Sequence, residues 1–276
     1  MRWTPGGRSE NLEDRRGSGG GLGRGLGIGG TVVVLALSLI TGRNLFSDLG
    51  VQPGVGSGTT AGMTAEDSAR EEPEVLFVSH ILDDVQQKWG TMLSGSNVDF
   101  HPARLVLFRN STGSGCGPAQ SAMGPFYCPV DQRVYIDLGF YDELKTRFGA
   151  SGDFAQAYVL AHELGHHIQH LTGTDARVRA AEESNPDQAN QYSVRLELQA
   201  DCYAGVWASK SDELSPGDID EALAAAAAVG DDRIQQRERG SVNVDAFTHG
   251  SAAQRTEWFK RGYQGGDMKA CNTFGS

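Results

Sequence analysis

The sequence predicts an α+β fold that is mostly helical, with a small β-sheet and a single transmembrane helix in front of it. Three observations support this prediction. Apolar residues recur at helical spacing in several segments, the clearest of which is 153–173. Two runs rich in β-branched and aromatic residues, 104–108 and 133–137, are typical of strands. An uncharged run at residues 25–42 has about the minimum length of a membrane span.

The N-terminal part of the chain is predicted to carry the membrane anchor. Residues 1–24 are polar and glycine-rich, which predicts a disordered cytoplasmic tail. Residues 25–46 are the predicted transmembrane anchor. Arginines dominate its N-terminal flank, so the positive-inside tendency puts the rest of the chain outside the cytoplasm. A cleaved signal peptide is the alternative, but no small-x-small cleavage site follows the apolar run.

A linker and a folded domain follow the predicted anchor. Residues 47–73 are rich in Gly, Ser, Thr and Pro and end in acidic residues, which is typical of a linker. The folded domain is expected at 74–276, on the outer face of the cell membrane as part of a single-pass protein. Its first helix starts near Glu74, with Pro73 in the first turn. The other predicted helices span 142–148, 153–173, 185–209, 215–229 and a segment that begins at Ser251.

The composition favours a globular domain without a nucleic-acid partner. The chain has 276 residues, of which 39% are hydrophobic, and this is enough for one sizeable core. The formal net charge is -11, and an acidic balance argues against binding to a polyanion.

Four cysteines are predicted to form two disulfides if the domain lies outside the cytoplasm. Cys116 and Cys128 flank one loop and can close it, and Cys202 and Cys271 would then pair by elimination. Three connectivities are possible, and the sequence alone does not choose among them. A zinc site made of cysteines is the rival interpretation, but the chain contains no C-x-x-C.

The functional interpretation depends on the helix predicted at 153–173. Residues 162–166 read HELGH, an H-E-x-x-H pattern. Residues four apart share one face of a helix, so His162 and His166 can direct two imidazoles at one zinc ion. Glu163 projects beside them, where its carboxylate can take a proton from a zinc-bound water. The alternative is that both histidines are ordinary surface or core residues.

The third zinc ligand is predicted on the next long helix. Glu197 and Asp201 lie four apart on one face of it, and small residues continue that face, which can therefore lie close against Gly165. Glu197 is the predicted ligand. Asp201 would hydrogen-bond the far ring nitrogen of a ligating histidine and fix its tautomer. The small residues on that face are Ala204, Gly205 and Ala208. The alternative is that both acids form the solvent-exposed face of an amphipathic helix.

Other third ligands are less favourable. His170 lies one turn beyond His166, about 6 Å along the axis, which is too far for tetrahedral zinc with bonds of ~2 Å. His167 points to a different face of the helix. Asp201 is the best substitute for Glu197, because an aspartate can also ligate zinc.

Several segments in a fixed order carry a resemblance to a known family. They are GPFYCP at 124–129, VYID at 134–137, the run 152–169, ELQADCYAG at 197–205, GDDRIQ at 230–235 and THGS at 248–251.

With these segments the chain resembles the neutral zinc metallopeptidase family of bacteria, within the broader gluzincin-like peptidases. The resemblance covers roughly residue 74 to the C-terminus. It implies a zincin-like metallopeptidase domain, Zn2+ as cofactor, and a peptide or protein substrate. It also implies that His162, His166 and Glu197 are the ligands and that Glu163 is the catalytic base.

The predicted reaction is hydrolysis of a peptide bond by a membrane-anchored endopeptidase. His249 or Tyr203 would stabilise the oxyanion, although a structural loop histidine is the alternative for His249. An extended substrate is expected to add beside the strand at 134–137. Two other functions remain open: a catalytically silent module that binds peptides or cell wall, and a zinc amidase that acts on cell-wall crosslinks. An intact H-E-x-x-H and Glu197 argue against the silent module.

Overall fold

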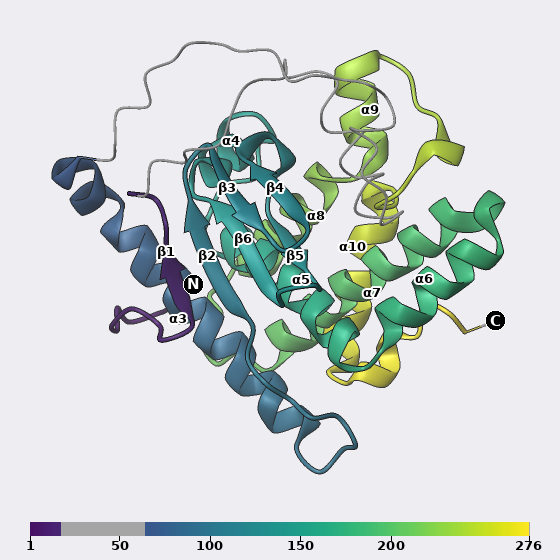
Figure 1. Cartoon of the computed structure of the whole chain (residues 1–276), viewed down its shortest axis with the longest axis horizontal. Coiled ribbons are helices and arrows are strands. Elements are labelled where there is room, and N and C mark those ends of the chain that lie inside the picture. The colour runs from purple at the N-terminus through teal and green to yellow at the C-terminus, as the bar shows by residue number, and fades with distance from the viewer. Residues whose placement is uncertain (18–63, 276) are drawn as a thin grey trace.

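Helices pack around and beside a small sheet in the computed structural model of the chain, which describes residues 1–17 and 64–275 (Figure 1). In this part of the chain, the four strands of the main sheet have the order β1–β2–β6–β5. β1, β2 and β6 are parallel, and β5 runs antiparallel to β6. The α+β prediction is confirmed. The strands are β1 (Leu12–Asp14), β2 (Arg104–Phe108), β5 (Phe126–Cys128) and β6 (Arg133–Asp137).

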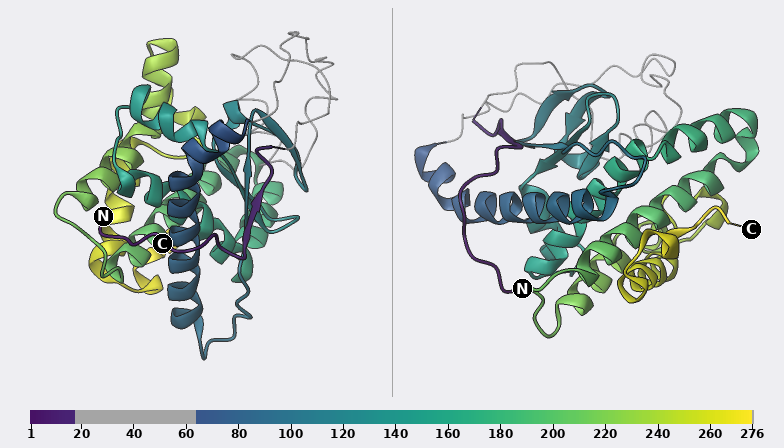
Figure 2. Two further views of the ribbon diagram at one scale, coloured as in Figure 1. Left: turned by 90° about the vertical axis from the view of Figure 1, so that its left-hand side faces the viewer. Right: turned by 90° about the horizontal axis from the view of Figure 1, so that it is seen from below.

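The helices form the larger part of the fold. α3 (Ala65–Leu93), drawn in blue, runs across one face of the sheet (Figure 2). The opposite face carries a smaller apolar cluster that includes Phe108 and Tyr135. A hairpin of β3 (Ser111–Ser114) and β4 (Gly117–Gln120) follows β2. The helices are α3 (Ala65–Leu93), α4 (Gly139–Thr146), α5 (Asp153–Leu171), α6 (Thr174–Ser184), α7 (Ala189–Ser209), α8 (Asp218–Ala228), α9 (Asp231–Arg239) and α10 (Ala252–Gly265).

The prediction of a transmembrane helix needs correction. Residues 25–46 lie outside the described part of the chain, and within that part no helix is both long and apolar enough to cross a membrane. The single-pass arrangement also conflicts with the sheet. β1 pairs with β2, with Leu12 opposite Leu105, so the two ends that were predicted on opposite sides of a membrane share one sheet.

The N-terminal segment is folded, contrary to the prediction of a disordered tail at 1–24, over the part that the structure describes. Arg16 is buried and donates hydrogen bonds to Glu71 at 2.8 Å and to Asp14 at 2.7 Å. Trp3 packs edge-on against Phe77 of α3, with ring centroids 5.2 Å apart. The segment looks unstructured by composition because its partners are charged residues far along the chain.

α3 begins earlier than the sequence suggested. Thr64 caps the helix, and Asp67 bonds back to the Thr64 backbone, which completes a capping box. Pro73 therefore lies inside α3 and not at its start. The predicted linker at 47–73 is wrong from residue 65 onward, and its residues 47–63 lie outside the described part of the chain.

Glycines set how closely α7 approaches its neighbours. A Cβ atom on Gly165 of α5 would lie 3.1 Å from the carbonyl oxygen of Ala200 on α7, so the predicted close contact is confirmed. The small residues further along α7 have a different partner, α10. A Cβ on Gly205 would lie 2.1 Å from the Phe259 oxygen, and one on Gly262 would lie 1.9 Å from the Cys202 oxygen. Larger residues at either position would force the two helices apart.

Both predicted disulfides are present. Cys116 is bonded to Cys128, and Cys202 of α7 is bonded to Cys271. The second bond ties the C-terminal segment to the helix that carries Glu197 and Asp201.

The expected substrate position beside 134–137 is wrong. β6 lies between β2 and β5, so strands already occupy both of its edges. β5 is the edge strand on this side of the sheet, and it packs on α5.

Replacing Arg16 tests whether the N-terminal segment is part of the fold. Arg16→Ala should lower the free energy of unfolding by about 2 kcal/mol, because Glu71 is mostly buried and loses one of its two guanidinium partners. Urea unfolding of the full chain measures this change. Arg70→Ala is the control, since Arg70 is exposed and pairs with the partly exposed Asp67 on the same helix, and it should leave the midpoint nearly unchanged. Equal midpoints for Arg16→Ala and the parent would contradict the folded segment.

Candidate metal centre

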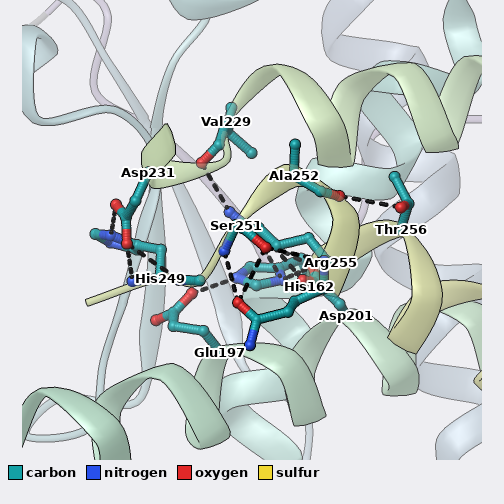
Figure 3. A network of polar contacts seen from close by, with 12 residues as sticks. His162, Glu197, Asp201, Val229, Asp231, His249, Ser251, Ala252, Arg255 and Thr256 are labelled. Carbon is teal, nitrogen blue, oxygen red and sulfur yellow. Dashed lines mark hydrogen bonds and ion pairs between the residues drawn. The ribbon is translucent and has the colours of Figure 1, made fainter. Parts of the chain in front are cut away.

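α5 and α7 bring three nitrogen or oxygen donors to one point. His162 and His166 come from successive turns of α5, and Glu197 comes from α7. Figure 3 shows the contact between Glu197 and His162. The two histidine Nε2 atoms are 3.2 Å apart. The Glu197 carboxylate lies 3.2 Å from Nε2 of His162 and 3.4 Å from Nε2 of His166. These separations match the edge of about 3.3 Å between ligands of a tetrahedral zinc with bonds of ~2.0–2.1 Å.

The hydrogen bonds on the far side of each ring fix the histidine tautomers. Nδ1 of His162 lies 2.8 Å from the Asp201 carboxylate, and Nδ1 of His166 lies 2.8 Å from the side-chain oxygen of Gln169. The Gln169 amide is oriented because its nitrogen donates to the Leu196 carbonyl at 2.7 Å. In the neutral form of each ring, Nδ1 therefore carries the proton and Nε2 presents a lone pair. Two lone pairs and a carboxylate that face each other require a cation, so the residues fit zinc.

The charges of the site keep Glu197 ionised and also favour a proton on His162. Burial raises the pKa of Glu197, but the imidazoles of His166 and His162 outweigh it and hold that pKa well below its usual range. Burial also opposes a charge on His162, yet Asp201 and Glu197 raise the pKa of its imidazole to about 10. A proton therefore competes with a metal ion for this group.

Sequence reasoning missed Arg255, which anchors the site from α10. Its side chain is 4% exposed and donates from Nε and Nη2 to the two oxygens of Asp201, at 2.8 and 2.9 Å. The Tyr158 hydroxyl also donates to Asp201, at 2.5 Å. Burial raises the pKa of Asp201, but Arg255 outweighs it, and the net pKa is lowered. Asp201 therefore stays ionised beside Nδ1 of His162, the far ring nitrogen that it was predicted to contact.

Glu163, the predicted base, follows His162 in α5 and is 8% exposed. Its charge contributes to raising the pKa of Tyr141, although burial of the tyrosine is the larger cause. Its role as base stays a prediction.

His249 lies beside Glu197 in a loop that Asp231 holds (Figure 3). The Asp231 carboxylate accepts the backbone N–H groups of Thr248, His249 and Gly250 at 2.6–3.0 Å, and its other oxygen lies 3.2 Å from Nδ1 of His249. The His249 side chain remains 42% exposed. Asp231 is a second residue near the site that sequence reasoning missed.

Three other residues weighed from the sequence lie away from the metal ligands. Tyr203 packs in the core, with its ring 5.2 Å from Trp89, so it is not available as an oxyanion donor. His167 points elsewhere, as predicted, and contacts the Tyr127 hydroxyl. His170 contacts Asp175 and is not part of the metal group.

Comparisons with known proteins place the chain in a family. The chain matches the model of a family described as "Putative neutral zinc metallopeptidase" over residues 1–274. It is 45% identical to uncharacterized protein YpfJ of Escherichia coli (strain K12) over an alignment 287 positions long, which covers 100% of this chain and 99% of the relative. It is 48% identical to uncharacterized protein Rv2575 of Mycobacterium tuberculosis (strain ATCC 25618 / H37Rv) over 206 residues, which cover 70% of this chain and 68% of the relative. No solved structure matches the chain.

Zinc affinity should fall as the pH falls. In the metal-free protein His162 holds a proton below its pKa of about 10, and zinc must displace that proton. Each pH unit downward should therefore weaken the apparent affinity about tenfold for each proton displaced. Competition with a chromophoric chelator across the neutral range measures this slope. An affinity that does not change with pH would contradict the assignment of His162 as a ligand.

Asp201→Asn should weaken zinc binding by about 10–100-fold, because the amide no longer fixes the His162 tautomer as a carboxylate does. The same competition assay measures the loss. Glu213→Gln is a matched control, since Glu213 forms a carboxylate–histidine pair with His80 outside the site, and its zinc affinity should equal the parent value. Equal affinities in both variants would mean that Asp201 has no part in the metal centre.

Proposed function

Because the chain belongs to the neutral zinc metallopeptidase family, we propose that it is a zinc-dependent endopeptidase that hydrolyses peptides or proteins. The observation that carries this proposal is the convergence of His162, His166 and Glu197. Their donor atoms all lie within 4.8 Å of one another, and hydrogen bonds point both histidine lone pairs inward. Three protein ligands leave the fourth tetrahedral position for water or substrate, which is the arrangement of catalytic zinc sites.

The protein residues have separable tasks in this reaction. A bound zinc ion would lower the pKa of water to about 7 and polarise the scissile carbonyl. Glu163 takes the proton from the attacking water and passes it to the leaving amine. Burial disfavours the charged form of His249, but the Asp231 hydrogen bond and the Glu197 charge outweigh this and raise its pKa. A protonated His249 can donate to the oxyanion of the tetrahedral intermediate.

β5 is the proposed platform for the substrate. It is the edge strand of the sheet on the side of α5, and the Tyr127 hydroxyl links it to His167 of the same helix. An extended peptide can add to such an edge through backbone hydrogen bonds, which makes recognition tolerant of sequence. Peptides with N-methylated amide bonds near the cleavage site should therefore be poorer substrates, and equal cleavage would exclude this mode.

The disulfides support a proposed location outside the cytoplasm. All four cysteines are paired, and disulfides persist in oxidising compartments. Cells lysed directly into a denaturing, non-reducing buffer that contains an alkylating agent should give protein with every cysteine unmodified. Alkylated cysteines in the mature protein would contradict this location.

Replacing the base tests the proposed function most simply. Glu163→Gln keeps the shape and the metal ligands but cannot take a proton, so it should bind zinc as the parent does and lose about 10²–10⁴-fold in kcat. Cleavage of an unbiased peptide library and zinc content are measured together on the full chain.

Glu183→Gln is the matched control, because Glu183 is an exposed carboxylate on α6. The Glu183→Gln variant should cleave peptides at the parent rate. If Glu163→Gln cleaves as fast as the parent, the base is misassigned. If the zinc-loaded parent cleaves no peptide in the library, the proposed peptidase activity is wrong.

A further inference from the structure

Two of the three exposed large apolar residues in the described part of the chain lie in the segment between α9 and α10 (Figure 1). Val242 is 45% exposed and Val244 is 69% exposed. Asn243 between them has an extended backbone, so both valines point to the same side of the segment. They therefore form one apolar pair that faces solvent, in the same loop as His249.

Hydrogen bonds and one buried ring hold this segment in place. The backbone N–H of Asn243 donates to the side-chain oxygen of Gln235 on α9 at 2.7 Å, and the Asn243 side chain accepts from the Asp245 N–H at 3.2 Å. Phe247, three residues beyond Val244, is buried. Apolar side chains on a tethered backbone lose little conformational entropy when they bind a partner, so this pair is suited to recognition.

The same segment runs along α7 toward the metal ligands. The Asn190 side chain donates to the Asp245 carbonyl at 2.8 Å, and the Ser193 hydroxyl donates to the Thr248 carbonyl at 2.8 Å. These contacts advance in the same direction along the segment and along α7, and the next turn of α7 carries Glu197. The segment therefore lies on the face of α7 that holds the metal ligand, with the valines near the start of the helix.

The distance from the valines to the metal position matches a short stretch of extended peptide. Asn190 precedes Glu197 by seven residues on α7, and a helix rises 1.5 Å per residue, which gives about 10 Å along the axis. An extended peptide advances about 3.3 Å per residue. A substrate whose scissile carbonyl lies at the metal would therefore place a side chain near Val244 about three or four residues from the cleaved bond.

We propose that Val242 and Val244 bind an aliphatic side chain of the substrate, about three or four residues from the scissile bond. This inference rests on the proposed peptidase function and names a substrate class for it, namely peptides or proteins with an apolar residue at that distance. Backbone pairing with β5 is tolerant of sequence, so the valines supply selectivity. A contact remote from the reacting atoms stabilises the bound substrate and the transition state equally, so it lowers KM and leaves kcat unchanged.

A cleavage profile of the zinc-loaded full chain on an unbiased peptide library tests this inference. The parent should favour Val, Ile or Leu at about the third or fourth position from the cleaved bond. A Val242→Ser, Val244→Ser double variant should lose that preference. Its KM for the best apolar peptide should rise about tenfold at unchanged kcat, because the aliphatic contact is lost. When serine replaces the apolar residue of that peptide, the parent and the double variant should have equal KM and kcat, which also reports that the variant is folded.

Val130→Ser is the matched control, because Val130 is the third exposed valine and lies in the β5–β6 turn, outside this segment. The Val130→Ser variant should keep the parent profile. A parent that cleaves without an apolar preference at that distance would overturn this inference alone, and so would a double variant that keeps the preference. A parent that cleaves no peptide would overturn the peptidase function as well.

Discussion

The metal centre depends on one buried ion pair, between Arg255 of α10 and Asp201 of α7. Both side chains are buried, so water cannot solvate their charges, and each charge is stabilised by the opposite charge of its partner. The pair keeps Asp201 ionised against burial, and Asp201 in turn orients His162 of α5. Three helices are thus joined at the point where one imidazole is aimed at the metal position. Loss of either charge would leave the other buried and unpaired.

The packing around this pair explains why the helices can meet there. Gly205 and Gly262 let α7 and α10 touch through their backbones, and Gly165 lets α5 approach α7 at Ala200. A second support runs from the disulfide at Cys271. The Cys271 carbonyl accepts from Gln199, whose oxygen accepts from Gln169, the residue that orients His166. The two histidines are therefore held by different parts of the C-terminal half of the chain.

Local sequence patterns predicted the residues that touch the metal position. His162 and His166 share a helix face by their spacing, and Glu197 and Asp201 repeat that spacing on the next long helix, so helical periodicity was sufficient. Arg255 and Asp231 were not predictable in the same way. Both are charged residues whose partners lie far away in the sequence, and no spacing rule distinguishes a buried arginine from an exposed one.

The prediction of a disordered N-terminal tail was wrong for the same reason. Its composition is that of an unstructured tail, but Arg16 is matched to Glu71 of α3, and β1 completes the edge of the sheet beside β2. The family model matches from residue 1, whereas the resemblance seen in the sequence began only near residue 74. Strand pairing over such a distance is set by tertiary contacts that composition does not encode.

The central claim is that two imidazoles of α5 and one carboxylate of α7 hold a single zinc ion. Anomalous diffraction at the zinc edge from crystals of the full chain tests it most directly. A peak within bonding distance of His162, His166 and Glu197 is predicted, with Nδ1 of His162 still on Asp201. A fully occupied zinc peak elsewhere, with the Glu197 side chain turned away from both histidines, would contradict it.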